Sequence, residues 1–246
     1  MPDRQEKANE ENNRNKEALN ENPRARVNHH YRSFLKKWWL LSWPRPRLMR
    51  KIRKLPRYAT CGRLAKRPIF VFVSPTINPN DMLQVFLLTD DYSFGILQSR
   101  IHWLWRLERC STLKRDFRYT STTVYNSFPW PQAPSLAQVR AVARTAVDLR
   151  ELRRDLMQEH GYTLRELYRT LELPGDNPLK QAHTRLDTAV RKAYKMKAKA
   201  NVLESLFTLN RLLVEKEATL QKVVGPGLPP AVKDASKFIT EDCIMA

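Results

Sequence analysis

Residues 93–109 read SFGILQSRIHWLWRLER, and this stretch decides the expected fold. Its large apolar side chains recur at helical spacing: Phe94, Leu97, Ile101, Leu104 and Trp105. That spacing puts them on one face, so the pattern predicts a single amphipathic helix that covers a core. The preceding residues, TDDYS, provide acidic and hydroxyl side chains that favour a helix start.

Three strand-like segments come before this helix. Residues 57–64, 68–74 and 82–89 read RYATCGRL, PIFVFVS and MLQVFLLT. They are short, rich in β-branched or aromatic side chains, and separated by residues that favour turns. Residues 110–134 have no helical period and end in prolines and aromatics, so a polar loop or strand is expected there.

The chain changes character at Ser135, from which four amphipathic helices are expected. The first stops at Gly161, the second has Thr163 and Glu166 in capping-box spacing, and the third begins at Pro178. The predicted fold class is therefore α+β, a mixed α/β domain followed by an α-helical domain. The predicted boundaries are residues 1–30 for a polar linker or helix, 31–132 for the mixed domain, 133–230 for the helical domain and 231–246 for a tail.

Positive charge is concentrated in one block. Residues 31–68 contain thirteen Lys or Arg and no Asp or Glu, in a chain whose formal net charge is +19. Such a block favours nucleic acid as a partner, because neutralised phosphates release condensed counterions. The alternative is a solvated basic face, or a surface that contacts ribosomes or anionic lipid. Within the block, WPRPRLMRKIRKLP predicts a short helix with Leu48, Ile52 and Leu55 on one face.

Composition disfavours several classes of protein. No apolar run reaches the roughly 18 residues that predict a membrane span, and the polar N-terminus lacks the apolar core of a secretory signal. Cys61, Cys110 and Cys243 are far apart, and no CxxC or HxxxH spacing occurs. Neither a disulfide framework nor a metal site is expected, and a reducing cytoplasm suits the chain best.

Long stretches of the chain resemble one family. Residues 34–70, FLKKWWLLSWPRPRLMRKIRKLPRYATCGRLAKRPIF, resemble the entry to the target-recognition region of MmeI-like, adenine-specific DNA methyltransferases. Residues 90–132, DDYSFGILQSRIHWLWRLERCSTLKRDFRYTSTTVYNSFPWPQ, resemble the core of that region. Residues 149–194 are similar to the helical C-terminal domain that follows it, and the resemblance covers roughly residues 15–246.

The resemblance implies a bacterial, cytoplasmic DNA-binding protein of a restriction–modification or phage-defence system. The full-length family consists of class I methyltransferases that use S-adenosylmethionine. Adenine methylation needs a glycine-rich turn after a strand and an Asn/Asp-Pro-Pro-aromatic motif that holds the flipped base. Neither occurs here, since NPND at 78–81 and DNPL at 176–179 lack the second proline and the aromatic, and GPG at 225–227 follows a helix. We therefore expect no catalytic residue and no cofactor in this chain, and a catalytic domain or subunit encoded upstream.

Two sets of residues are candidates for contact with duplex DNA. Cations of the basic block are expected to bind the phosphate backbone: Arg45, Arg47, Arg50, Lys51, Arg53, Lys54, Arg57, Arg63, Lys66 and Arg67. A second set offers side chains that can read base edges: Gln98, Arg100, Lys114, Arg115, Arg118, Tyr119, Thr120, Ser121 and Thr122. Alternatively, some of the cations pack on aromatics, and residues 113–123 form scaffold, which the resemblance favours.

The aromatics of this region have two interpretations as well. Trp103, Trp105, Phe128 and Trp130 either stack on a base or belong to the core, and their helical spacing and proline neighbours favour the core. His102 is expected to be structural. The leading hypothesis is a DNA target-recognition fragment, and the alternatives are a decayed or truncated gene product and a general basic RNA-binding protein.

Overall fold

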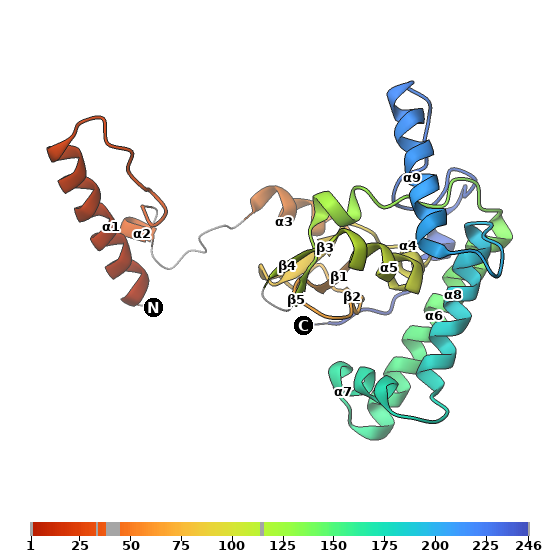
Figure 1. Ribbon diagram of the computed structural model, residues 1–246. Coiled ribbons are helices and arrows are strands. Elements are labelled where there is room, and N and C mark those ends of the chain that lie inside the picture. Colours follow the sequence, from red (N-terminus) through yellow and green to blue (C-terminus); the bar gives the residue numbers. More distant parts are fainter. Residues whose placement is uncertain (1, 33, 38–44, 114–115, 246) are drawn as a thin grey trace. The chain divides into compact units, whose positions relative to one another are not determined.

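The computed structural model describes residues 2–32, 34–37, 45–113 and 116–245 (Figure 1). The chain divides into two compact units, Met1–Arg50 and Lys51–Ala246. In the first, α1 (Pro2–Glu21) and α2 (Phe34–Lys37) are helices. Glu11 lies on the buried side of α1, where its carboxylate accepts a hydrogen bond from the Tyr31 backbone N–H at 2.8 Å. Within residues 1–30, the segment Pro2–Glu21 is a helix and residues 22–30 are not.

A three-stranded antiparallel sheet begins the second unit. Its strands β1 (Tyr58–Gly62), β2 (Val71–Val73) and β3 (Leu83–Phe86) have the order β2-β1-β3, with Thr60 opposite both Val71 and Val85. The three predicted strands are thus confirmed at shorter length. A separate hairpin consists of β4 (Ser111–Leu113) and β5 (Asp116–Arg118). The short helix expected in the basic block is α3 (Pro46–Ile52), and its Ile52 is buried.

The predicted single helix over residues 93–109 is two helices, α4 (Asp91–Gln98) and α5 (Arg100–Arg109), so that prediction was wrong in one respect. Ser99 ends one helix and begins the other, with an extended ψ of 157°. Its hydroxyl donates to the Ile96 carbonyl at 2.7 Å and accepts from the His102 N–H at 3.4 Å. A serine that bonds local backbone groups in this way competes with the helical ladder, which explains the break.

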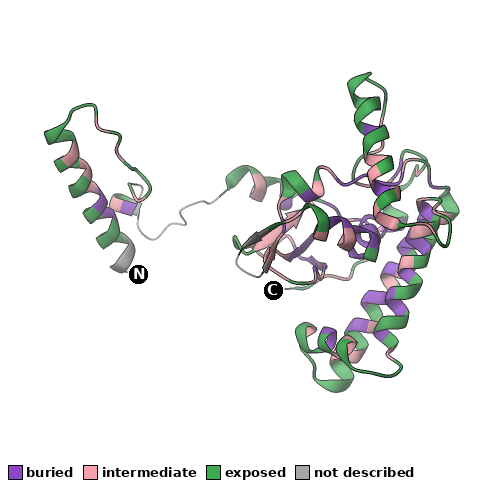
Figure 2. Ribbon diagram, in the orientation of Figure 1, coloured by how far each residue is buried: buried purple, intermediate pink, exposed green. Residues whose placement is uncertain are grey.

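The four helices expected after Ser135 are all present. They are α6 (Leu136–His160), α7 (Leu164–Arg169), α8 (Pro178–Ala193) and α9 (Val202–Ala218). Capping boxes start α6 and α7, and Gly161 ends α6 in the left-handed conformation at φ 66°. The inner stripes of α6 and α8 are buried against each other (Figure 2).

Helix α4 joins the sheet to the helical region. All eight of its residues are buried, and it packs against α6. A Cβ on Gly95 would lie 2.8 Å from Cγ1 of Val142, so only glycine permits this close approach. One hydrophobic core therefore extends from β1 and β3 through α4 to α6 and α8. The mixed α/β and helical parts predicted from the sequence are both present, and they share this core.

The C-terminal tail returns to the sheet. Ser74 donates its N–H to the Ile244 carbonyl at 2.9 Å, and Ile244 donates to the Phe72 carbonyl at 2.9 Å. This parallel bridge covers part of the exposed edge of β2. None of the helices that the structure describes is both long and apolar enough to cross a membrane.

Candidate nucleic-acid interface

The predicted backbone-binding cations of the first unit lie at the surface. Arg45, Arg47 and Arg50 are exposed, and the latter two are on α3. The tryptophans of the same basic block, Trp38, Trp39 and Trp43, lie outside the described residues. The three arginines are therefore available to a polyanion.

In the second unit, four of the predicted cations are exposed. Lys51, Lys54 and Lys66 form no ion pair with any carboxylate of the described residues. Arg53 is exposed too, but its guanidinium donates to the Pro75 carbonyl at 2.8 Å and to Oδ1 of Asn78 at 2.9 Å. Two of its terminal nitrogens are thus engaged by the turn between β2 and β3.

Two further cations are half-buried. Arg63 donates to the Asp81 carbonyl at 3.0 Å. The Arg67 guanidinium lies 4.9 Å from the ring centroid of Trp103 and 5.3 Å from that of Tyr168. Burial lowers the Arg67 pKa from its ordinary value. Arg67 therefore packs on aromatics, which is the alternative considered for this set.

Arg57 was wrongly assigned to the phosphate backbone, because its side chain is buried at 1% exposure. Its guanidinium donates to Oδ1 of Asp91 at 2.7 Å and to Oδ1 of Asp242 at 3.0 Å. It also lies 3.6 Å from the ring centroid of Phe72. The Arg57 charge is therefore paired with carboxylates inside the protein and does not reach DNA, so Arg57 is a structural residue.

The carboxylates that bind Arg57 also bind Arg150 of α6. Arg150 donates to Asp91 at 2.6 Å and to Oδ2 of Asp242 at 2.6 Å. Burial alone would raise the pKa of the Asp242 carboxyl, but the Arg150 hydrogen bond and charge, with help from Thr240 and Arg57, lower it to about 2. We call Arg57, Asp91, Arg150 and Asp242 the buried charge cluster. Its ion pairs connect the start of the sheet, α4, α6 and the C-terminal tail.

Two candidates for base readout are structural instead. Gln98 is buried, and its side-chain oxygen accepts from the Phe70 N–H at 2.8 Å. Tyr119 is fully buried, and its hydroxyl lies 3.0 Å from Nε2 of His102. Neither side chain reaches the surface, so both assignments were wrong. His102 is structural as expected, since burial lowers its pKa to about 3 and Nδ1 lies 2.8 Å from the Leu97 carbonyl.

The remaining readout candidates are at or near the surface. Arg100, Ser121 and Thr122 are exposed, whereas Arg118 and Thr120 are half-buried. Arg118 ends β5, and Thr120, Ser121 and Thr122 follow it at the start of a one-turn π-helix, η1 (Ser121–Tyr125). The other two candidates, Lys114 and Arg115, lie outside the described residues. Their role in readout stays a prediction.

Arg106 has a positioning role that the sequence did not reveal. It is fully buried on α5 and donates hydrogen bonds to the carbonyls of Ala65, Lys66 and Phe117, the last at 2.9 Å. Burial lowers its pKa, and the partners are neutral carbonyls. The residue joins the basic loop before Pro68 to the β4–β5 hairpin. No side-chain pattern in the sequence signalled this role, because the partners are backbone carbonyls.

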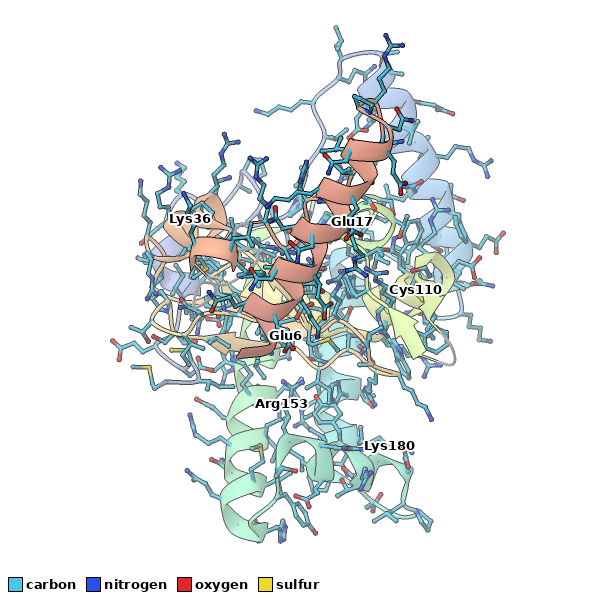
Figure 3. All side chains as sticks on the ribbon, turned by 90° about the vertical axis from the view of Figure 1, so that its left-hand side faces the viewer. Glu6, Glu17, Lys36, Cys110, Arg153 and Lys180 are labelled. Carbon is cyan, nitrogen blue, oxygen red and sulfur yellow. The ribbon has the colours of Figure 1, made fainter. Side chains whose placement is uncertain are left out.

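The aromatic residues form core, as their spacing favoured. Trp105, Phe128 and Trp130 are buried, and Trp103 is half-buried beneath Arg67. The three cysteines are unpaired, and burial raises the pKa of the Cys61 thiol to about 12. Cys110 lies at the end of α5 (Figure 3). The part of the chain that the structure describes contains no group of three metal-ligating side chains.

Comparisons with known proteins identify both structural parts of the second unit. Residues 63–132 match a family model described as the MmeI target recognition domain, and residues 134–218 match one described as the MmeI C-terminal domain. DNA methyltransferase A of Bacillus subtilis (strain 168) is 33% identical over 136 residues, which are 55% of this chain and 15% of that protein.

One solved structure has the same fold over most of the chain. The Type IIL restriction–modification enzyme MmeI, in complex with DNA, aligns with a TM-score of 0.57 and 23% identity. The alignment covers 65% of this chain and 21% of MmeI. The chain therefore spans about a fifth or less of the length of either relative. Since the two family models together match more than half of its residues, the chain belongs to the MmeI family, of which it contains the target recognition domain and the C-terminal domain.

Proposed function

We propose that the chain binds duplex DNA and is the target-recognition part of a site-specific adenine-N6 DNA methyltransferase of restriction–modification or phage-defence type. The match to the MmeI target recognition domain over residues 63–132 carries this proposal. The exposed cations Lys51, Lys54 and Lys66 support it, because lysines that have no carboxylate partner among the described residues are free to neutralise phosphates. The place of action would be the bacterial cytoplasm.

The catalytic step would belong to another polypeptide or domain. The glycines of this chain do not fit a binding site for S-adenosylmethionine. Gly225 and Gly227 follow the helix α9 and not a strand. Nothing lies within 4 Å of where their Cβ atoms would be, so neither glycine is required by a close contact. The chain would instead supply affinity and register for a methyltransferase domain or subunit encoded upstream.

Fluorescence anisotropy with a labelled duplex tests DNA binding directly. The purified chain should bind at low salt, and log K should fall linearly with log salt, with a slope of about −5 if about six phosphates are contacted. Absence of duplex binding at low salt would contradict the proposal. A preference for a structured RNA over the duplex would support the general RNA-binding alternative instead.

A reconstitution experiment tests the recognition role. The chain is mixed with the product of the upstream reading frame, S-adenosylmethionine and DNA, and methyl incorporation is measured with and without the chain. Incorporation that requires both proteins supports the proposal. Incorporation by the chain alone would contradict the assignment of catalysis to another part.

A further inference from the structure

The connection between α8 and α9 is a second concentration of positive charge. Residues 188–203 contain five cations and no Asp or Glu: Arg191, Lys192, Lys195, Lys197 and Lys199. Arg191 and Lys192 are in the last turn of α8, where cations are stabilised by the helix dipole. Lys195, Lys197 and Lys199 lie beyond the helix, so the dipole does not explain them. We call residues 194–200 the lysine loop.

The lysine loop alternates between anchored and exposed side chains. Tyr194 donates its hydroxyl to the Pro129 carbonyl at 2.9 Å, and half-buried Met196 packs against the core. The three lysines between and after these anchors are exposed. None of them forms an ion pair with a carboxylate in the described parts of the chain. The anchors therefore face the protein while the charges face solvent.

Arg191 fixes the backbone of the loop. Its guanidinium donates to the carbonyls of Lys197 at 2.8 Å, Ala198 at 3.0 Å and Ala200 at 3.1 Å. Lys195 adopts a left-handed φ of 55°, which closes the turn after α8. Three lysines on a fixed backbone lose less conformational freedom when they bind than lysines on a flexible one.

Like charges held this close repel one another, and binding of an anion relieves the repulsion. The partner must present several negative charges close together, because the three exposed lysines lie within five residues of a backbone that consists mostly of turns. The sugar–phosphate backbone of duplex DNA has this chemistry. We propose that Lys195, Lys197 and Lys199 bind phosphates of the DNA duplex, as a contact separate from the basic block. This inference rests on the proposed DNA-binding function and adds to it a site in the C-terminal domain.

Phosphate contacts position a protein on DNA without reading its sequence. The lysine loop should therefore contribute affinity and salt dependence equally on any duplex. The experiment compares the wild-type chain with K195Q/K197Q/K199Q, by anisotropy over a range of salt concentrations and on two duplexes of unrelated sequence. Because the three side chains are exposed, the variant should have an unchanged melting temperature.

A matched variant, K180Q/K216Q/K222Q, removes the same charge elsewhere. Lys180 lies near the opposite end of α8 from the loop (Figure 3), and Lys216 lies in the last turn of α9, whose first turn adjoins the loop. All three control lysines are exposed. A general effect of net charge would appear in both variants, and a local phosphate contact only in the first.

The loop variant should bind both duplexes more weakly, with a log–log salt slope that is less steep by about 3, whereas the control should stay near the wild-type slope. Equal slopes for the two variants would overturn the inference, as would a loss confined to a structured RNA. If the wild-type chain itself did not bind duplex DNA, the proposed function would fail. If the wild-type chain bound the duplex and the loop variant had the same affinity and salt slope, the lysine loop would be excluded as a DNA contact while the proposed function would stand.

Discussion

The arginines of the buried charge cluster are paired with carboxylates, whereas the exposed lysines of the basic block have no carboxylate partner among the described residues. Arg57 lies between Lys54 and Lys66 in sequence, yet it is enclosed by Asp91 and Asp242, which are 34 and 185 residues away. Lys54 and Lys66 have no such partner among the described residues. Distant carboxylates, and not the local density of charge, decide which cations remain free for DNA.

Removal of Arg150 should have the largest effect on stability. Arg150→Met leaves the carboxylates of buried Asp91 and half-buried Asp242 with Arg57 as their remaining guanidinium, and breaking a buried ion pair costs about 3–5 kcal/mol. Urea unfolding measures the change. Arg154→Met on the same helix is the control, because Arg154 is exposed and its ion pair within the described residues is with exposed Asp155 at 3.8 Å. If both variants lost the same unfolding free energy, the buried charge cluster would contribute no more to stability than an exposed ion pair.

The buried histidines should make the fold sensitive to mild acid. Burial lowers the pKa of His102 to about 3 and that of His183 to about 2, so both stay neutral when folded. The unfolded chain takes up protons on both below pH about 6.5, and stability must fall as pH decreases from there. The loss should be on the order of 3 kcal/mol at pH about 5.5. His183→Gln should reduce the slope of unfolding free energy against pH by half, and an unchanged slope would contradict this account.

Asp242 should contribute stability at neutral pH that is lost only in stronger acid. Its folded pKa of about 2 lies below the usual value of 3.8. The contribution is therefore complete above pH about 4 and disappears as pH falls toward 2, and it is on the order of 2 kcal/mol. Asp242→Asn should be less stable than wild type at pH 7 by that amount, with the difference vanishing in acid. Chemical unfolding at several pH values measures it, and a constant difference would argue against the ionic origin.

The exposed lysines should have the smallest effect on stability and a clear effect on binding. K51Q/K54Q/K66Q should unfold like the wild type, because none of the three side chains has a carboxylate partner in the described residues. Its duplex affinity should be lower, and its salt slope less steep by about 3. Calorimetry and anisotropy measure the two quantities. A stability loss comparable with that of Arg150→Met would remove the contrast between the two regions.

Local signals predicted much of the fold. Ser135 and Thr163 start helices because their hydroxyls cap the next turn, and Gly161 ends one because it tolerates positive φ. Helical periodicity placed Trp105 in the core, and the adjacent proline favoured the same place for Phe128, both correctly. These features depend on neighbours within a few residues, which a sequence displays directly.

Long-range contacts limited how much of the candidate site could be predicted from the sequence. Arg57 and Gln98 looked like surface residues because their partners, Asp242 and the Phe70 backbone, are distant in sequence. Arg106 was missed because its partners are backbone carbonyls, which no side-chain pattern reveals. The break at Ser99 likewise reflects a choice between two sets of local hydrogen bonds that periodicity does not resolve. A cation can be assigned to DNA only after its protein partners are known.

Lysine acetylation with and without duplex DNA, read by mass spectrometry, tests the central claim most directly. The claim is that the exposed lysines of the basic block and of the lysine loop bind DNA phosphates. DNA should protect Lys51, Lys54 and Lys66, and also the lysine loop, while Lys180, Lys216 and Lys222 react as in the free protein. Equal protection of all exposed lysines, or protection of none under conditions where the duplex is bound, would contradict it.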